Sequence, residues 1–218
     1  MDSVSGVGVI DKGVLILHAL AIGPLDLVAL QDATGLPRAT AHRLAVALEQ
    51  HHLVRRDAQG RFCLGFELIR LGRAAAEAFP LAELALPVLT ALRDHTGESV
   101  QLYVREDDAR RCIVSLQSPH ALRWMVPVGA LLPLGVGSAG KLLAETRQGE
   151  AGPGVAQSVE EREPGVASVS APVFDRQHRI VAAVSISGPV ERLSREPLHR
   201  FGVDVERAAS AITDTYPR

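Results

Sequence analysis

The sequence has few cysteines and no long hydrophobic run. Its two cysteines, Cys63 and Cys112, lie far apart and have no neighbours at metal-ligand spacing, so neither a disulfide framework nor a metal site is expected. No apolar run approaches the roughly 18 residues of a membrane span. Residues 1–8 lack the basic region and apolar core of a secretion signal. We therefore expect a cytoplasmic protein without a membrane partner, metal or cofactor.

The chain also lacks a strong overall charge. Its 218 residues carry 23 Lys and Arg against 25 Asp and Glu, a formal net charge of -2, which does not indicate a nucleic-acid binder. The positive charge is local instead. Between Pro37 and Arg61, five arginines are accompanied by only two acidic residues, Glu49 and Asp57. This segment can therefore present a basic surface on an otherwise ordinary globular composition.

The stretch 28–65 organises the chain. Two helical patterns meet at Gly35, whose permissive backbone suits a tight corner, and Pro37 has the fixed φ favoured at the start of a second helix. The second helix has one apolar stripe. Its members are Ala41, Leu44, Ala45 and Leu48. A short hairpin with a turn at 57–60 follows, so the pattern predicts a winged helix-turn-helix.

The outer face of this motif carries the candidate DNA contacts. Hydroxyl, imidazole and guanidinium groups in the first two turns of a recognition helix suit base edges and phosphates in the major groove. Arginines on the wing suit phosphates and supply the salt-dependent part of the affinity. The predicted DNA-binding residues are Arg38, Thr40, His42 and Arg43 on the helix, and Arg55, Arg56 and Arg61 on the wing.

In the remaining chain, the spacing of apolar residues changes from a helical to a strand pattern and back again. Helical patterns cover residues 10–21, 66–79, 81–95 and 197–216, and the surplus apolar residues of the first suggest a dimer contact. Strand patterns cover 99–105, 111–117, 122–128, 166–174 and 180–187. We expect an α+β fold with a mostly antiparallel sheet. The predicted domains are 1–65 for DNA binding, 66–79 as a linker helix and 80–218 as a second domain.

Three segments, in order, carry a resemblance to a known family. They read TGLPRATAHRLAVALEQHHLVRRDAQGRFCLG, VGALLPLGVGSAGKLLAE and EEREPGVASVSAPVFDRQHRIVAAVSISGPVERLS. Together they resemble the isocitrate-lyase-regulator (IclR) family of bacterial transcription factors over nearly the whole chain. The wording HRLAVALE, QGRF and EREPGVASVSAPV most resembles an actinobacterial branch associated with leucine and amino-acid metabolism.

The resemblance implies a winged-helix DNA reader joined by a linker helix to a GAF-like effector-binding domain, working as a homodimer or a dimer of dimers. It places the effector site at a helix start and on the last sheet strands. A carboxylate or amino acid is the implied effector, because serine hydroxyls and the free N–H groups of a helix start suit a carboxylate. The implied effector residues are Ser138, Ala139, Ser168, Ser185 and Ser187, with Leu122, Met125, Val126 and Leu132 as an apolar wall.

Two departures from the family pattern affect this site. Ser158 stands where some members have an acidic residue. The segment Thr146 to Ala156 is short and Gly-rich where the family carries two further helices, so a reduced effector lid is expected.

Three other functions fit parts of the sequence less well. The segment 135–141, GVGSAGK, has P-loop spacing, but Leu142 stands where a Ser or Thr would bind Mg²⁺. The histidines lie in different elements and outside nucleophile-elbow or metal-ligand spacing, so an enzyme is not expected. A winged helix used only for protein interaction would leave the polar, basic face at Arg38, Thr40 and Arg43 without a purpose.

Overall fold

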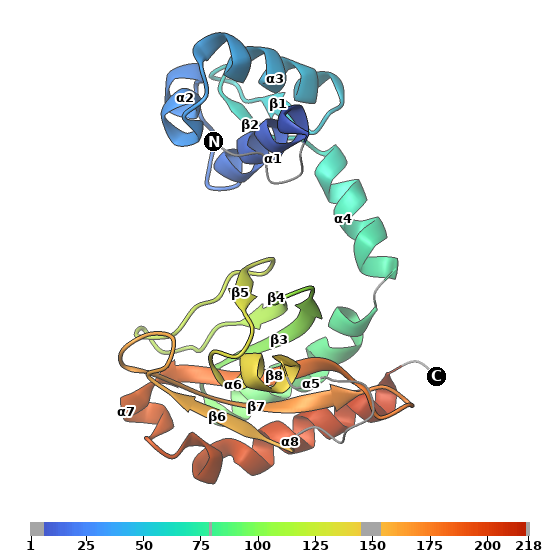
Figure 1. Ribbon diagram of the computed structural model, residues 1–218, viewed down its shortest axis with the longest axis vertical. Coiled ribbons are helices and arrows are strands. Elements are labelled where there is room, and N and C mark those ends of the chain that lie inside the picture. The colour runs from blue at the N-terminus through green and yellow to red at the C-terminus, as the bar shows by residue number, and fades with distance from the viewer. Residues whose placement is uncertain (1–6, 79, 145–153, 217–218) are drawn as a thin grey trace. The chain divides into compact units, whose positions relative to one another are not determined.

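The computed structural model describes residues 7–78, 80–144 and 154–216. The chain forms two compact units, Met1–Phe79 and Pro80–Arg218 (Figure 1). Within the described residues no single helix is long and apolar enough to span a membrane. Each unit has its own buried core, and each is described by itself below.

The N-terminal unit begins with helices α1 (Gly8–Leu20), α2 (Leu27–Thr34) and α3 (Arg38–Gln50). Asp26 caps α2, because its side chain accepts a hydrogen bond of 2.8 Å from the backbone N–H of Ala29. Gly35 ends α2 in the left-handed conformation, with φ 66°. Pro37 was predicted to start the next helix but is its N-cap, with φ -56° and ψ 142°, and α3 begins one residue later.

Strands β1 (Val54–Arg56) and β2 (Phe62–Leu64) pair antiparallel as the wing, and Phe62 also bridges to Leu25. At Gly65, directly after β2, the backbone passes close to His52. A Cβ at this position would lie 1.9 Å from the carbonyl oxygen of His52, so only glycine fits. The core beneath the wing joins all three helices. Its buried members are Ile16, Ala19, Leu20, Leu30, Leu36, Ala41, Leu44, Ala45, Val54 and Phe62. Helix α4 (Glu67–Ala78) ends this unit.

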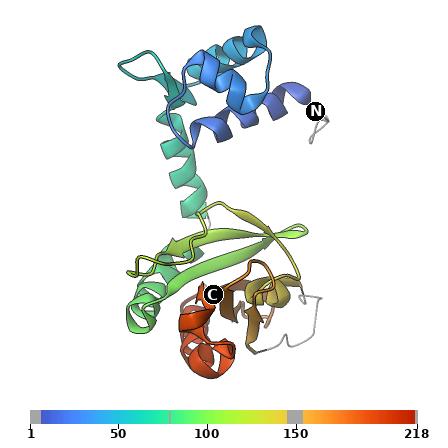
Figure 2. The same ribbon diagram turned by 90° about the vertical axis from the view of Figure 1, so that its left-hand side faces the viewer.

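The C-terminal unit has one antiparallel sheet in the order β5-β4-β3-β8-β7-β6. The central strands are β3 (Ser99–Glu106), β8 (Ile180–Pro189) and β7 (Val166–Phe174), flanked by β4 (Ala109–Leu116). The edge strands are β5 (Leu131–Pro133) and β6 (Ala156–Val159). Figure 2 shows β3 and β4 as a long hairpin. The α+β fold class with an antiparallel sheet is confirmed.

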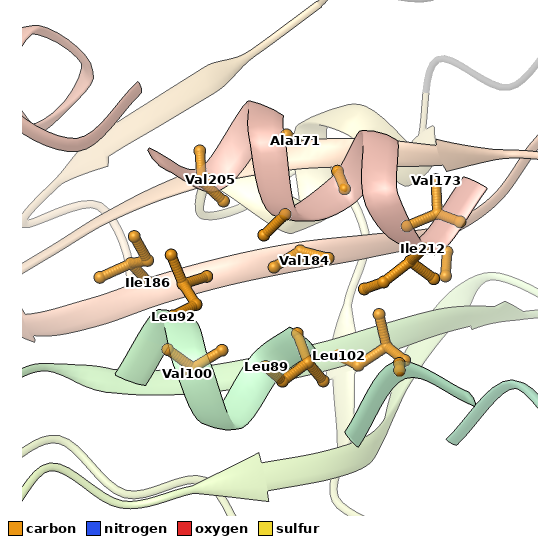
Figure 3. Packing of buried hydrophobic residues seen from close by; sticks show 14 of the residues in the cluster. Leu89, Leu92, Val100, Leu102, Ala171, Val173, Val184, Ile186, Val205 and Ile212 are labelled. Atoms are coloured by element: carbon orange, nitrogen blue, oxygen red, sulfur yellow. The ribbon is translucent and has the colours of Figure 1, made fainter. Parts of the chain in front are cut away.

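Helices α5 (Leu81–Thr96) and α8 (Pro197–Thr215) cover one face of this sheet. Figure 3 shows how Leu89 and Leu92 of α5 and Val205 and Ile212 of α8 pack over the strands. The short helix α6 (Ser138–Ala144) packs on the opposite face. Helix α7 (Val190–Leu193) is a single turn after β8. One face of the sheet therefore packs in the apolar core, and the other face is available for a binding site.

The strand expected at 122–128 is wrong. Residues 119–130 form an irregular loop, and the strand that pairs with β4 is β5, at Leu131–Pro133. Pro127 has no N–H for a ladder hydrogen bond. Of the apolar residues in the segment, Val126 is buried, whereas Leu122, Met125 and Val128 are exposed. The apolar run therefore does not mark a strand with a buried face.

Candidate DNA-binding surface and effector cavity

The outer face of α3 presents the predicted recognition residues to solvent. Arg38, His42 and Arg43 are exposed, and Thr40 is half-buried. Among the described residues, no carboxylate forms an ion pair with Arg38 or Arg43. These two guanidinium charges are therefore available to a polyanion.

The wing arginines have internal partners. Arg56 forms an ion pair of 3.3 Å with Glu49 and lies 4.2 Å from the centroid of the Phe62 ring. Arg61 pairs with Asp57 at 2.7 Å across the wing turn. Arg55 lies 4.9 Å from the centroid of the Phe66 ring. All three arginines remain exposed, so the wing holds its charges in place while leaving them open to solvent.

Polar side chains form two cross-strand rows on the open face of the C-terminal sheet. In one row, Ser99 pairs with Ser187, Ser187 with Ser168, and Ser168 with Ser158. The next row contains Gln101, Ser185 and Ser170. Because alternate residues of a strand point to the same face, these side chains make a hydroxyl-rich floor.

A cavity lies over this floor. Its lining includes Ser138, Ala139, Ser168, Ser185 and Ser187, which are the five predicted effector residues apart from the apolar wall. The lining continues through Tyr103, Arg110, Trp124, Gly137, Ser158, Arg162, Glu163 and Val166. The cavity volume is about 30 Å³, which suits about two water molecules. The cavity is therefore smaller than a typical metabolite site.

The predicted apolar wall lies elsewhere. Leu122 and Met125 are 71% and 55% exposed, and neither they nor Val126 and Leu132 line the cavity. Val126 and Leu132 pack instead in a small cluster with Leu142 and Leu143 of α6. The large apolar surfaces in the cavity are the rings of Tyr103 and Trp124. For Leu122, Met125 and Val126 the reason is the irregular loop at 119–130, which does not alternate its side chains as a strand would, whereas Leu132 lies on β5.

The start of α6 is held by internal contacts. The Ser138 Oγ lies 2.8 Å from the Ser168 Oγ and 2.7 Å from the Ser170 Oγ. The Gly137 N–H donates to the Glu161 carboxylate over 3.3 Å, and Lys141 forms an ion pair with the same carboxylate. An internal acid thus already occupies one N–H group at this turn. The lysine of the P-loop-like segment is likewise engaged by Glu161 and by the carbonyl oxygen of Gln157.

The cavity also contains the guanidinium of Arg110, a residue that the sequence did not single out. Arg110 is 3% exposed and lies 5.4 Å from the centroid of the Tyr103 ring. Its Nη1 donates to the carbonyl oxygens of Pro133 and Val136, the latter over 2.7 Å. The signal for it was the alternation of strand 109–116, which puts Arg110 on the same side as the buried Cys112.

Burial controls the ionisation of the groups next to Arg110. It raises the pKa of Tyr103 well above its usual range, and it raises the pKa of the Cys112 thiol to about 12. Both groups are therefore neutral at physiological pH. Burial also lowers the pKa of Arg110 itself, and the nearby Arg162 adds to this effect. The guanidinium stays charged, because an arginine pKa starts above 12.

Most of the Gly-rich segment at 146–156 lies outside the described residues, which omit 145–153. The expected reduction of an effector lid therefore stays a prediction. In the part of the chain that the structure describes, no group of three or more His, Cys, Asp or Glu side chains could hold a metal ion.

Two family models match this chain. Residues 9–58 match the model described as the IclR helix-turn-helix domain. Residues 73–152 and 151–214 match the model described as the C-terminal domain of the bacterial transcriptional regulator IclR. The first match covers helices α2 and α3 with most of α1 and strand β1 of the wing, and the second covers the sheet domain with its cavity.

Curated proteins and solved structures agree with this assignment. The chain is 26% identical to the transcriptional repressor IclR of Escherichia coli, covering 89% of this chain and 84% of that protein. It is 32% identical to the glycerol operon regulatory protein of Streptomyces coelicolor, covering 86% and 87%. An IclR homologue from Microbacterium hydrocarbonoxydans, complexed with 4-hydroxybenzoate, has the same fold, with a TM-score of 0.77, 18% identity and coverage of 94% and 98%. With both domains matched in order, the chain belongs to the IclR family of DNA-binding bacterial transcriptional regulators, not to an enzyme family.

Proposed function

We propose that residues 1–65 bind a specific DNA operator through the outer face of α3 and the wing. In this proposal Arg38, Thr40, His42 and Arg43 enter the major groove, and Arg55, Arg56 and Arg61 contact the phosphates beside it. The exposure of the unpaired Arg38 and Arg43 supports this assignment. Arg56 and Arg61 keep their internal partners while they face solvent, so their contribution is expected to be smaller.

Residues 80–218 are proposed to bind the controlling metabolite in the serine-floored cavity. The observation that supports this proposal is that four serines and one alanine, from three separate segments, line one cavity. They are Ser138, Ala139, Ser168, Ser185 and Ser187. The small volume implies that occupancy moves side chains, and such a difference between bound and free forms is what a switch requires.

The working unit is proposed to be a homodimer or a dimer of dimers. Helix α1 buries Ile16, Ala19 and Leu20 in its own core but leaves Val9 59% and Ile10 58% exposed. An apolar surface of this kind suits a second copy of the chain. Two recognition helices would then reach successive major grooves of a pseudo-palindromic site. The linker at 66–79 would transmit the effect of the metabolite, whose differential affinity sets the size of the response.

The target genes are proposed to serve amino-acid metabolism, with leucine or a related intermediate as the candidate signal. This rests on the wording HRLAVALE, QGRF and EREPGVASVSAPV alone. Repression is the proposed sign of regulation, since the Escherichia coli relative is named a repressor. A cytoplasmic location agrees with a regulator that works on DNA.

Fluorescence anisotropy of labelled DNA from upstream of the protein's own gene tests the DNA-binding half. A scrambled duplex of equal length is the control, and both are titrated over a salt series. Tighter binding to the native fragment that weakens steeply with salt is the expected result. Absence of binding to either duplex at low salt would reject DNA contact and favour a protein-interaction module.

A further inference from the structure

The cavity contains more positive than negative charge. Its lining has two guanidinium groups, Arg110 and Arg162, and one carboxylate, Glu163. Arg162 stacks 4.9 Å from the centroid of the Trp124 ring and also interacts with Tyr103, so both cations flank the same phenol. Among the described residues, neither guanidinium forms an ion pair with a carboxylate.

Of the two guanidinium groups, that of Arg110 needs a partner more, because its charge is buried. Its Nε atom is inaccessible to solvent and has no hydrogen-bond partner among the described atoms. Buried charges are ordinarily paired, since an uncompensated one is costly. Tyr103 and Cys112 remain protonated and cannot supply the missing negative charge. The carbonyl groups of Pro133 and Val136 satisfy one edge of the guanidinium only.

Room is kept for this guanidinium by two glycines. A Cβ on Gly140 would lie 2.1 Å from the Arg110 Nη1, and one on Gly137 would lie 3.4 Å from its Nη2. The Gly137 N–H, which a helix start would offer to a carboxylate, is already taken by Glu161. Anion recognition at this helix start therefore has a competitor inside the protein, whereas Arg110 has no carboxylate partner in the part of the chain that the structure describes.

We propose that Arg110 is the residue that binds the negative group of the effector, with Arg162 as a second, less buried cation at the same end of the cavity. The ligand is thus a small organic monoanion whose carboxylate faces Arg110 and whose polar groups face the serine floor. The net lining charge of one positive unit fits a single negative charge on the ligand. This inference rests on the proposed effector role of the cavity.

Arg110 also links the ligand to the chain around it. The same guanidinium that would receive the carboxylate holds the loop between β5 and α6 through Pro133 and Val136. A carboxylate that binds through both oxygens would reorient the Arg110 guanidinium, because this group is rigid and planar. Ligand binding would therefore affect Ser138, which begins α6 and contacts Ser168 and Ser170 of β7 in the floor.

The test compares carboxylates with their uncharged amides on the unmodified full-length protein. The probe pairs are acetate and acetamide, pyruvate and pyruvamide, and 4-hydroxybenzoate and 4-hydroxybenzamide, with ionic strength matched by sodium chloride. Binding is followed by the fluorescence of Trp124, the single tryptophan, and by thermal stabilisation. At least one carboxylate is expected to bind at least about tenfold more tightly than its amide.

Three variants locate the charge. Arg110→Gln and Gly140→Ala, which displaces the same guanidinium, are each expected to weaken the carboxylate about tenfold and to leave the amide unchanged. The matched control is Arg111→Gln, because Arg111 lies next in the strand but pairs with Glu106 at the surface. A role of Arg110 in loop structure alone would weaken carboxylate and amide equally.

Equal affinity for carboxylates and amides, or the absence of binding by every carboxylate in the panel, would overturn the inference. The DNA titration is independent of this result. Specific DNA binding without carboxylate binding would remove the role of Arg110 and keep the regulator. Carboxylate binding without DNA binding would keep the role of Arg110 and remove the proposed operator contact.

Discussion

Glu98 and Arg192 form a bidentate ion pair, with the Arg192 Nε 2.6 Å from Oε1 and its Nη2 2.8 Å from Oε2. Glu98 precedes β3 and Arg192 belongs to α7, so the pair joins the start of the central sheet to the turn after β8. Gly188 leaves the space for it, since a Cβ there would lie 2.5 Å from the Glu98 Oε2. The pair fixes the end of the strand that carries Ser185 and Ser187.

Breaking this pair should destabilise the C-terminal unit. Arg192→Met leaves the Glu98 carboxylate, whose side chain is 4% exposed, without its cation. We expect a loss of about 1–3 kcal/mol in the free energy of unfolding, less than for a fully enclosed pair because Arg192 is partly exposed. Urea unfolding followed by Trp124 fluorescence measures it. The control is Arg195→Met, which breaks an exposed pair with Glu160 and should cost under about 0.5 kcal/mol.

Arg43→Ala should weaken DNA binding at every salt concentration and reduce the salt slope by about one unit if Arg43 contacts a phosphate. If it reads a base instead, specificity for the native fragment should relax with a loss of about 1–3 kcal/mol. Carboxylate binding should be unchanged in either case. Arg176→Ala, in an exposed turn of the other unit, removes the same charge and should leave DNA affinity unaltered. Equal losses in both variants would show that only overall charge matters.

Ser187→Leu should abolish carboxylate binding and leave DNA binding unchanged, the opposite of Arg43→Ala. Ser187 is 5% exposed, lines the cavity and donates to the Gln101 Oε1 over 2.7 Å, so a leucine fills scarce space and removes a hydroxyl. Carboxylate-dependent changes in Trp124 fluorescence should disappear while DNA affinity in the absence of ligand is kept. Ser210→Leu on the exposed side of α8 is the control. Retained carboxylate binding in Ser187→Leu would place the ligand elsewhere.

Two hairpin turns, at 57–61 and 175–179, have the same hydrogen-bond pattern and differ at the residue in the left-handed conformation. Asp57 and Asp175 each accept backbone N–H groups from the turn and pair with an arginine four residues on, and the left-handed position is Gly60 in one and His178 in the other. His178→Gly should therefore stabilise its unit by about 0.5–1 kcal/mol, because φ is 55° there. Gly60→Ala should destabilise by about 1 kcal/mol. Thermal unfolding followed by circular dichroism compares the two, and a destabilised His178→Gly would contradict the strain argument.

The Cys112 thiol should make the folded protein less stable in alkali. Because burial raises its pKa from an ordinary 9.0 to about 12, the folded state keeps the neutral thiol while the unfolded state ionises. The sign follows from linkage: the stabilisation is complete below pH 9 and is lost between pH 9 and 12, about 1 kcal/mol of it by pH 10. Cys112→Ala should lack this loss in urea unfolding at pH 8 and 10. Equal alkaline losses in both proteins would refute the assignment.

The sequence alone predicted the winged helix and the fold class, because the signals are local. Gly35 and Pro37 mark the corner between two helices, and period 3.6 changes to period 2 near residue 99. Through resemblance to a family with contiguous motifs, it also named four serines and one alanine that line one cavity. The prediction of a strand at 122–128 was wrong. The run of apolar residues there has the composition of a strand, but Pro127 has no N–H for hydrogen bonding to a neighbouring strand.

Tertiary structure decided what else surrounds that cavity. Register places Ser158, Ser168, Ser187 and Ser99 in one row, and register depends on which strands become neighbours. Arg110 reads as one more charge near a hairpin turn, yet the loop before α6 closes over it and buries it. Local propensity determines helices, strands and turns, whereas burial of a charge depends on contacts between residues far apart in the chain. The charge of the cavity could therefore be found only in the folded protein.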